Sequence, residues 1–257
     1  MSDFDRNYAT AQRGVGADRA LEIDAGLRAY MIRVYNYMAL GVALTGLVAW
    51  FAFQAAGGDA IQLTSKGIVG LTPFGQTFFT GFMPIVLMLG TLGLVFFLSF
   101  RIDRLQPSTA FTLFMAYAAL LGLSLTTIFF AYTGVSITRV FFISAAAFGA
   151  LSLYGYTTQR NLSAWGSFLF MGLIGIIIAS VVNIFVASSM MQFIISCVGV
   201  LVFAGLTAYD TQQIKEMYDV NDDGTVAGRK AIMGALRLYL DFINLFIMLM
   251  QLIGDRR

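Results

Sequence analysis

The sequence predicts an all-α, polytopic membrane protein, and three observations lead to that fold class. Of the 257 residues, 58% are hydrophobic and only 12% are charged, about half the charged share of an average globular protein. The mean hydropathy is +0.79. The apolar residues gather into seven continuous runs of about 17 to 23 residues, the length that an α-helix needs to cross a hydrocarbon core of roughly 30 Å. A soluble fold would leave large apolar patches in water.

The predicted spanning helices follow one another within residues 34–257. They cover residues 34–56, 82–100, 110–131, 140–156, 166–186, 190–209 and 231–253. Each run is continuous, whereas the strands of a membrane barrel alternate in polarity over about ten residues. We therefore expect a helix in every span, the fourth being the shortest. The seventh is either a full span or a re-entrant segment that returns the C-terminus to the side of the N-terminus.

Residues 1–33 form a polar leader before the first span. This leader mixes five arginines with five acidic residues and lacks the apolar stretch of a cleaved signal peptide. We expect it to be largely disordered and cytosolic, with an interfacial helix from about Leu21 onward. The sequence indicates no second domain.

The basic residues indicate the orientation in the membrane. With the N-terminus in the cytosol, twelve of the 16 Lys and Arg residues fall in cytosolic segments. The other side then carries only Lys66, Arg139, Arg256 and Arg257. The positive-inside rule therefore predicts a cytosolic N-terminus and, for seven full spans, a C-terminus outside.

Composition also excludes several classes of function. The chain has no histidine, so it cannot build a Ser-His-Asp triad or an H-E-x-x-H zinc site. Its one cysteine, Cys197, excludes an internal disulfide and a site of several thiolates. A net charge of +2 with no basic stripe does not indicate nucleic-acid binding. We expect neither an enzyme nor a resident cofactor.

Two acidic residues lie where the bilayer makes a charge costly. Of 14 acidic residues, only Asp210, which closes the sixth run, and Asp241, inside the seventh, are not in the leader, loops or tail. A charge at the bilayer centre costs at least about 2.5 to 3.5 kcal/mol, so such residues usually face a bundle interior and have a partner. We expect the two carboxyl groups to meet in the cytosolic half. Alternatively, Asp210 is an interfacial acid and Arg237, one turn before Asp241, neutralises Asp241.

Two carboxyl groups in a low dielectric share one proton, so the pair would sense pH. Their oxygens, with that of Asn244 one turn further along, are hard ligands that suit Ca²⁺. Arg101 follows the second run directly. It is either a positive-inside anchor or a latch that pairs with Asp210 or Asp241 across the bundle.

The stretch at 219–224 resembles the start of an EF-hand calcium loop. Asp219, Asn221 and Asp223 stand at positions 1, 3 and 5, and Gly224 at position 6. Position 12 is Lys230 where the loop needs a bidentate Glu. The pattern favours a polar turn over a weak calcium site.

Two stretches in the last spans resemble the signature motifs of the Bax inhibitor-1 family, also called the transmembrane Bax-inhibitor-motif family. They are residues 208–215 (AYDTQQIK), which include Tyr209, and residues 238–246 (LYLDFINLF). Residues 121–125 (LGLSL), 154–158 (YGYTT) and 182–185 (VNIF) strengthen the match to the bacterial branch. The resemblance extends from Arg28 to the C-terminus.

This resemblance implies a bundle with a central seventh helix, located in a bacterial inner membrane. It also implies a pH-sensitive calcium leak. Asp210 and Asp241 match the family's paired aspartates, and Arg101 falls where some members carry the arginine that latches onto the first of them. Arg237 beside Asp241 is a local difference. We expect Tyr209, Arg237 and Asn244 to support the pair.

Three functions stay open. The first is a Ca²⁺ leak channel gated by the proton-sensing pair, with the lipid bilayer, Ca²⁺ and protons as its partners. The second is a regulator that binds a membrane-embedded ATP-dependent protease, as bacterial relatives are linked to such control. The third is a proton-coupled transporter of a small solute, although the sequence shows no discontinuous helix.

Overall fold

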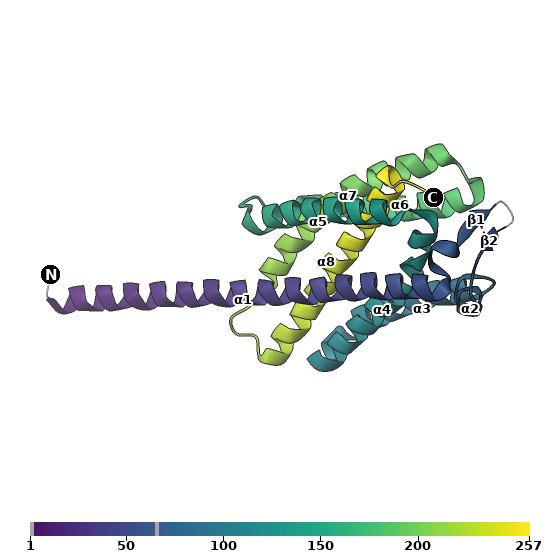
Figure 1. Cartoon of the computed structure of the whole chain (residues 1–257). Coiled ribbons are helices and arrows are strands. Elements are labelled where there is room, and N and C mark those ends of the chain that lie inside the picture. Colours follow the sequence, from purple (N-terminus) through teal and green to yellow (C-terminus); the bar gives the residue numbers. More distant parts are fainter. Residues whose placement is uncertain (1–2, 65–66) are drawn as a thin grey trace.

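The computed structural model describes residues 3–64 and 67–257, with side chains described over 25–62 and 67–257. Seven helices in that part are long and apolar enough to cross a membrane. They are α1 (Asp3–Ala56, spanning from Ala25), α3 (Met83–Arg101), α4 (Pro107–Ala131), α5 (Gly134–Thr157), α6 (Ser163–Val186), α7 (Ser189–Glu216) and α8 (Gly224–Ile253). The predicted all-α polytopic membrane fold is therefore confirmed (Figure 1).

The first spanning helix begins before the position that the sequence predicts. In the structure α1 starts at Asp3, and the predicted boundary at residue 33 falls inside the helix. Arg28 and Arg33 lie on its exposed face, whereas Tyr30, Met31 and Val34 are buried. The leader's last turns are therefore amphipathic and pack on the bundle. The side chains of residues 1–24 lie outside the described part.

Short elements fill the connection between α1 and α3. A 3₁₀ turn, η1 (Gly58–Ala60), leads into the antiparallel pair β1 (Gln62–Thr64) and β2 (Gly67–Val69), followed by α2 (Pro73–Phe79). Ile61 and Phe79 pack with Phe53 and Phe130 in a small apolar cluster of their own. This connection therefore covers the ends of α1 and α4.

Helix starts follow ordinary capping rules. The chain's three prolines, Pro73, Pro84 and Pro107, stand in the first turn of α2, α3 and α4, where the missing N–H costs nothing. Ser188 caps α7 and Asp223 caps α8, each by accepting a hydrogen bond from a backbone N–H three residues on.

The last helix, α8, lies at the centre of the bundle. It contacts α1, α4, α5 and α7, while α3 packs chiefly on α4 and α6 chiefly on α7. Its fully buried side chains include Ile232, Leu236, Leu238, Tyr239, Leu245 and Met250. In Figure 1, α8 (yellow) crosses the bundle obliquely. The expected central seventh span is thus confirmed, with four of the other six directly around it.

The same helix runs from one end of the bundle to the other. Near its start, Arg229 Nε donates to Leu105 O at 2.6 Å, just before α4 begins. Beyond its end, Arg256 forms a β-bridge with Tyr132, just after α4 ends. Because these partners flank opposite ends of a 25-residue helix, α8 is a full span. The C-terminus therefore lies at the other end of the bundle from the α7–α8 connection.

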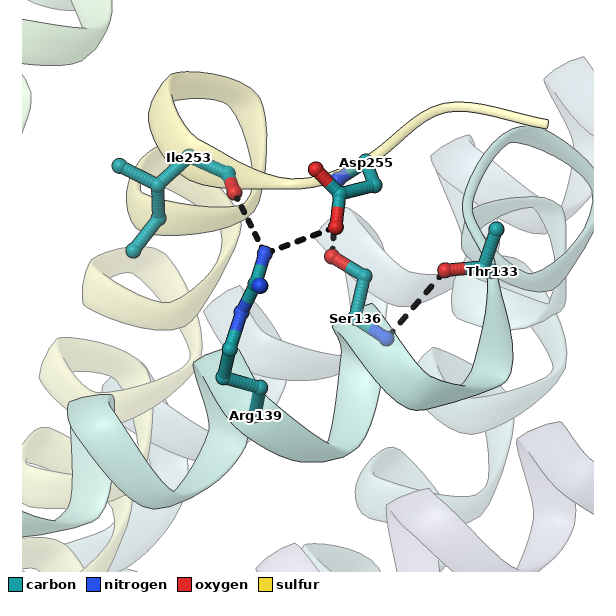
Figure 2. A network of polar contacts seen from close by, with 5 residues as sticks. All are labelled: Thr133, Ser136, Arg139, Ile253 and Asp255. Carbon is teal, nitrogen blue, oxygen red and sulfur yellow. Dashed lines mark hydrogen bonds and ion pairs between the residues drawn. The ribbon is translucent and has the colours of Figure 1, made fainter.

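Polar contacts tie the tail to the start of α5 (Figure 2). Arg139 Nη2 donates to Asp255 Oδ2 at 2.9 Å and to Ile253 O at 3.3 Å. The backbone N–H of Asp255 donates to Ser136 Oγ at 2.8 Å. Helix α5 starts six residues before the predicted span, because Thr133 caps it and Asp255 neutralises Arg139. The fourth span is therefore as long as its neighbours.

Candidate functional site

A cavity of about 620 Å³ opens between α6, α7 and α8. Its polar wall consists of Asp210, Arg237, Asp241 and Asn244, with Tyr209 beside them. Apart from Ser167, the rest of the lining is apolar and consists of Gly166, Phe170, Leu173, Phe203, Leu206 and Leu240. The two acids that the sequence places in apolar runs therefore meet in one cavity.

The two carboxyl groups of Asp210 and Asp241 interact side chain to side chain. Asp241 is only 5% exposed, and its Oδ2 has no hydrogen-bond partner in the described part of the chain. An ionised carboxylate only accepts hydrogen bonds, so two ionised groups would repel each other with one oxygen left unsatisfied. Two full charges at this place would therefore be costly.

Asp210 lies near the end of α7 that the sequence predicts to be cytosolic. Asp210 precedes the end of α7 by six residues, about 9 Å along the axis. At that end Lys215 Nζ donates to Tyr156 O, near the end of α5, at 2.9 Å. Asp210 is thus about two turns from this end of α7, whereas Asp241 lies 17 residues after the start of α8.

The cation beside the pair is Arg237. It precedes Asp241 by one turn of α8, lines the same cavity and interacts electrostatically with both acids. Arg101, in contrast, is exposed at the end of α3, and it joins none of the ion pairs among the described residues. The ion pair expected between Arg101 and the acids is therefore not formed. The reason is that α3 packs chiefly on α4.

Tyr209 and Asn244 frame the cavity. A Cβ at Gly166 would lie 2.6 Å from Tyr209 Cζ, so the glycine lets α6 approach this ring. Asn244 Nδ2 donates to Leu240 O at 2.8 Å, which leaves its amide oxygen as an acceptor.

A second cavity, of about 730 Å³, adjoins the first at Asn244. It lies among α2, α3 and α4, and Ser180 of α6 reaches its wall. Thr91, Ser124 and Thr127 add hydroxyl groups to a largely apolar lining. Asn244 therefore borders both cavities.

A cluster of uncharged polar side chains ties α6, α7 and α8 near their opposite ends. Asn183 Nδ2 donates to Gln192 Oε1 at 3.1 Å, and Gln192 Nε2 donates to Gln251 Oε1 at 2.6 Å. Ser196 Oγ also donates to Gln251 Oε1, at 3.0 Å. Sequence reasoning missed this cluster because it weighed only ionisable residues. The signal was present, since glutamine in an apolar run also needs a partner.

The oxygens at the first cavity are of the kind that Ca²⁺ binds. Asp210 and Asp241 supply carboxylates, and Asn244 supplies an amide oxygen. Ca²⁺ takes 6 to 8 oxygen ligands, so water must complete its shell here. No cluster of three His, Cys, Asp or Glu residues occurs among the described residues. The arrangement suits brief contact with a passing cation more than tight storage.

The acids of the 219–224 loop have local partners. Asp219 Oδ1 accepts hydrogen bonds from Asn221 N and Nδ2, both at 2.9 Å, which lower the pKa of Asp219. Asp223 caps α8, and Lys230 Nζ lies 2.6 Å from Asp222 Oδ2. These contacts favour the predicted polar turn.

Comparison with known proteins agrees with the predicted family. The chain matches the family model described as Inhibitor of apoptosis-promoting Bax1 over residues 27–257. It is 46% identical to an uncharacterized protein of Rickettsia prowazekii, over the full length of both chains. It is 43% identical to the inner membrane protein YbhL of Escherichia coli strain K12, covering 94% of this chain and 97% of YbhL. A Caulobacter vibrioides protein, also uncharacterized, is 41% identical over both full lengths. The chain belongs to the Bax inhibitor-1 family.

Proposed function

We propose that this protein is a pH-sensitive cation leak pathway, with Ca²⁺ as the cation that its oxygen ligands suit. The observation that carries the proposal is the Asp210–Asp241 pair in the wall of a cavity between three spanning helices. The orphaned Asp241 Oδ2 needs either a proton or a cation beside it. Protons and Ca²⁺ therefore compete for the same oxygens, and this competition couples the leak to pH.

The proposed gate is a two-state switch. With one proton shared, the pair carries a single negative charge, which Arg237 balances. When that proton leaves, two carboxylates face one guanidinium in a low dielectric, and their repulsion favours a state in which water or a cation enters. The protonation state of the pair therefore determines how closely α7 and α8, the helices that carry the two acids, pack together.

In this proposal Arg101 pairs with the acids in a state other than the one in this structure. It would reach the acids only if the end of α3 moved from α4 toward α7. Such a movement would alter the second cavity, which α3 lines. The adjoining cavities support a route along α8 past Asn244, and the amide cluster at the far ends of α6, α7 and α8 would be its outer constriction.

We also propose the orientation and location that the sequence predicts. The printed name of YbhL supports an inner membrane, and the excess of basic residues supports a cytosolic N-terminus with the C-terminus outside. Protease accessibility of a C-terminal tag in spheroplasts tests this: cleavage from outside is expected, and full protection would contradict it.

The function is tested by Ca²⁺ flux into liposomes that contain the purified protein, over a series of pH values on each side. Asp210→Asn and Asp241→Asn keep the shape of the side chains and remove their charge. We expect native flux to depend on pH and both variants to lose that dependence. Asp255→Asn is the matched control, because Asp255 is an exposed acid in the tail, and it should behave like the native chain.

Two outcomes would refute parts of the proposal. Absence of flux above empty liposomes at every pH would refute the leak. Unchanged pH dependence in both aspartate variants would refute the sensor. Arg237→Gln and Arg101→Gln test the two cations separately, because each should shift the pH dependence of flux only if that arginine pairs with the acids in one of the two states.

A further inference from the structure

A groove of about 930 Å³ runs between α1 and α5. Its walls extend from Arg28 to Ala43 on α1 and from Phe141 to Tyr156 on α5, with Phe242 of α8 at the base. Fifteen residue steps of a helix rise about 22 Å, which exceeds half of a hydrocarbon core of roughly 30 Å. The groove is therefore long enough to hold an acyl chain of one leaflet.

Small side chains keep this groove open. Ala39 and Ala43 line it on α1, and Ala145 and Gly149 face them on α5. A Cβ at Gly149 would meet nothing within 4 Å, so this glycine borders empty space. In a membrane, such space between two outer helices is filled by lipid.

The hydroxyl groups of Tyr35 and Ser152 in the wall are already paired. Tyr35 OH and Ser152 Oγ are 2.6 Å apart, and Ser152 Oγ lies 2.9 Å from Thr211 Oγ1. These bonds join α1, α5 and α7. A ligand in the groove therefore does not need to supply hydrogen-bond partners for these hydroxyl groups. The surface that a ligand would contact in the middle of the groove is apolar.

Two basic residues lie at one end of the groove. Arg28 lines it, and Lys215 Nζ lies 5.1 Å from the centroid of the Tyr156 ring, which forms the other lip. Neither cation joins an ion pair within the described part of the chain. Both lie on the predicted cytosolic side. Basic pockets between spanning helices on this side bind anionic headgroups.

We propose that this groove binds one anionic phospholipid of the cytosolic leaflet. Arg28 pairs with the lipid phosphate, Lys215 adds a second positive charge, and one acyl chain lies between α1 and α5. The chain end reaches Phe242, the neighbour of Asp241 on the central helix. The site is separate from the acidic cavity, so it stands whether or not the protein conducts cations.

Native mass spectrometry tests the proposal. The full-length protein is delipidated in detergent and equilibrated with equimolar phosphatidylglycerol and phosphatidylcholine that carry the same acyl chains. About 1 kcal/mol for each basic residue near the surface corresponds to about a fivefold preference per cation for phosphatidylglycerol. Arg28→Gln should reduce that preference about fivefold. Arg33→Gln is the matched control, since Arg33 is exposed on the same helix and does not line the groove.

Filling the groove gives a second, independent readout. Gly149→Leu should lower retention of both lipids, because its side chain takes the place of the acyl chain. Gly175→Leu is the control: Gly175 of α6 also has nothing within 4 Å, yet it lies outside the groove. Size-exclusion elution and helical circular dichroism confirm that each variant is folded.

Three results would overturn the proposal: no preference of the native chain for phosphatidylglycerol, an equal effect of Arg28→Gln and Arg33→Gln, or an equal effect of Gly149→Leu and Gly175→Leu.

Discussion

The contact between α5 and α7 at Gly155 gives a sharp test of the packing behind the acidic pair. A Cβ at Gly155 would lie 2.2 Å from Ala208 O, 2.9 Å from its carbonyl carbon and 3.0 Å from its Cα. All three are backbone atoms, so no side-chain rotation relieves the overlap. A carbon normally stays at least about 3.3 Å from a carbonyl oxygen. Gly155→Ala must therefore separate the helices by about 1 Å.

The expected loss follows from two opposing effects. Forcing a methyl group into a packed interface costs about 1 to 3 kcal/mol, whereas replacing glycine by alanine within a helix gains up to about 1 kcal/mol. Because the overlap is with backbone atoms, the upper end of that cost applies, and Gly155→Ala should lower the free energy of unfolding by about 2 kcal/mol. Gly149→Ala, in the same helix, meets open space and should be neutral or slightly stabilising.

The assay is thermal unfolding of both variants and the native chain in one detergent, followed by circular dichroism. A difference of about 2 kcal/mol corresponds to about 4 to 8 °C in Tm at this chain length. Gly155→Ala should melt below the native chain and Gly149→Ala should not. If both variants melt together, or Gly155→Ala melts higher, α5 and α7 are not in backbone contact there. The position of Asp210, two residues beyond Ala208, would then need another explanation.

Three further predictions concern single interactions. Tyr239→Phe removes a buried hydroxyl 2.6 Å from Thr45 Oγ1 and should cost about 1 kcal/mol of unfolding free energy; an unchanged Tm would show that the bond contributes nothing. Arg139→Gln breaks an ion pair whose side chains are at least half exposed, so its cost should stay below about 1 kcal/mol, and a larger loss of Tm would contradict this. Asn221→Ala leaves the backbone hydrogen bond and removes the side-chain one, so NMR titration should show the pKa of Asp219 rise part of the way to its ordinary value. A lowered pKa favours the folded state above the unfolded pKa and ceases to do so as pH falls through the folded pKa. The free energy of unfolding of the variant should therefore differ from that of the native chain at neutral pH, and the two should agree in strong acid.

Much of the fold could be predicted from the sequence, because a bilayer requires long apolar segments. Errors arose at helix ends. The fourth span was predicted to begin after Arg139, whereas the helix starts at Gly134. A charge near a span is normally read as its end, but here Asp255, more than a hundred residues away in the chain, neutralises it. The central place of α8 followed only from the family resemblance.

The candidate site, too, could be predicted only in part from the sequence. Asp210 and Asp241 could be predicted from their cost in the bilayer, and Arg237 from its position one helical turn before Asp241. The absence of Arg101 from the pair could not be predicted, since it depends on whether α3 packs on α4 or on α7. The bonds between Gln192 and Gln251 likewise depend on which helices are neighbours.

The sequence by itself determined seven apolar spans and two acids that must find partners within them. Both follow from how one segment interacts with lipid, which requires no knowledge of the other segments. Only the tertiary structure decided which helices touch. On α5, Gly155 meets the backbone of Ala208 while Gly149 borders an open groove. Two glycines in one helix thus have opposite surroundings, because the distance between helices depends on what faces each residue across the interface.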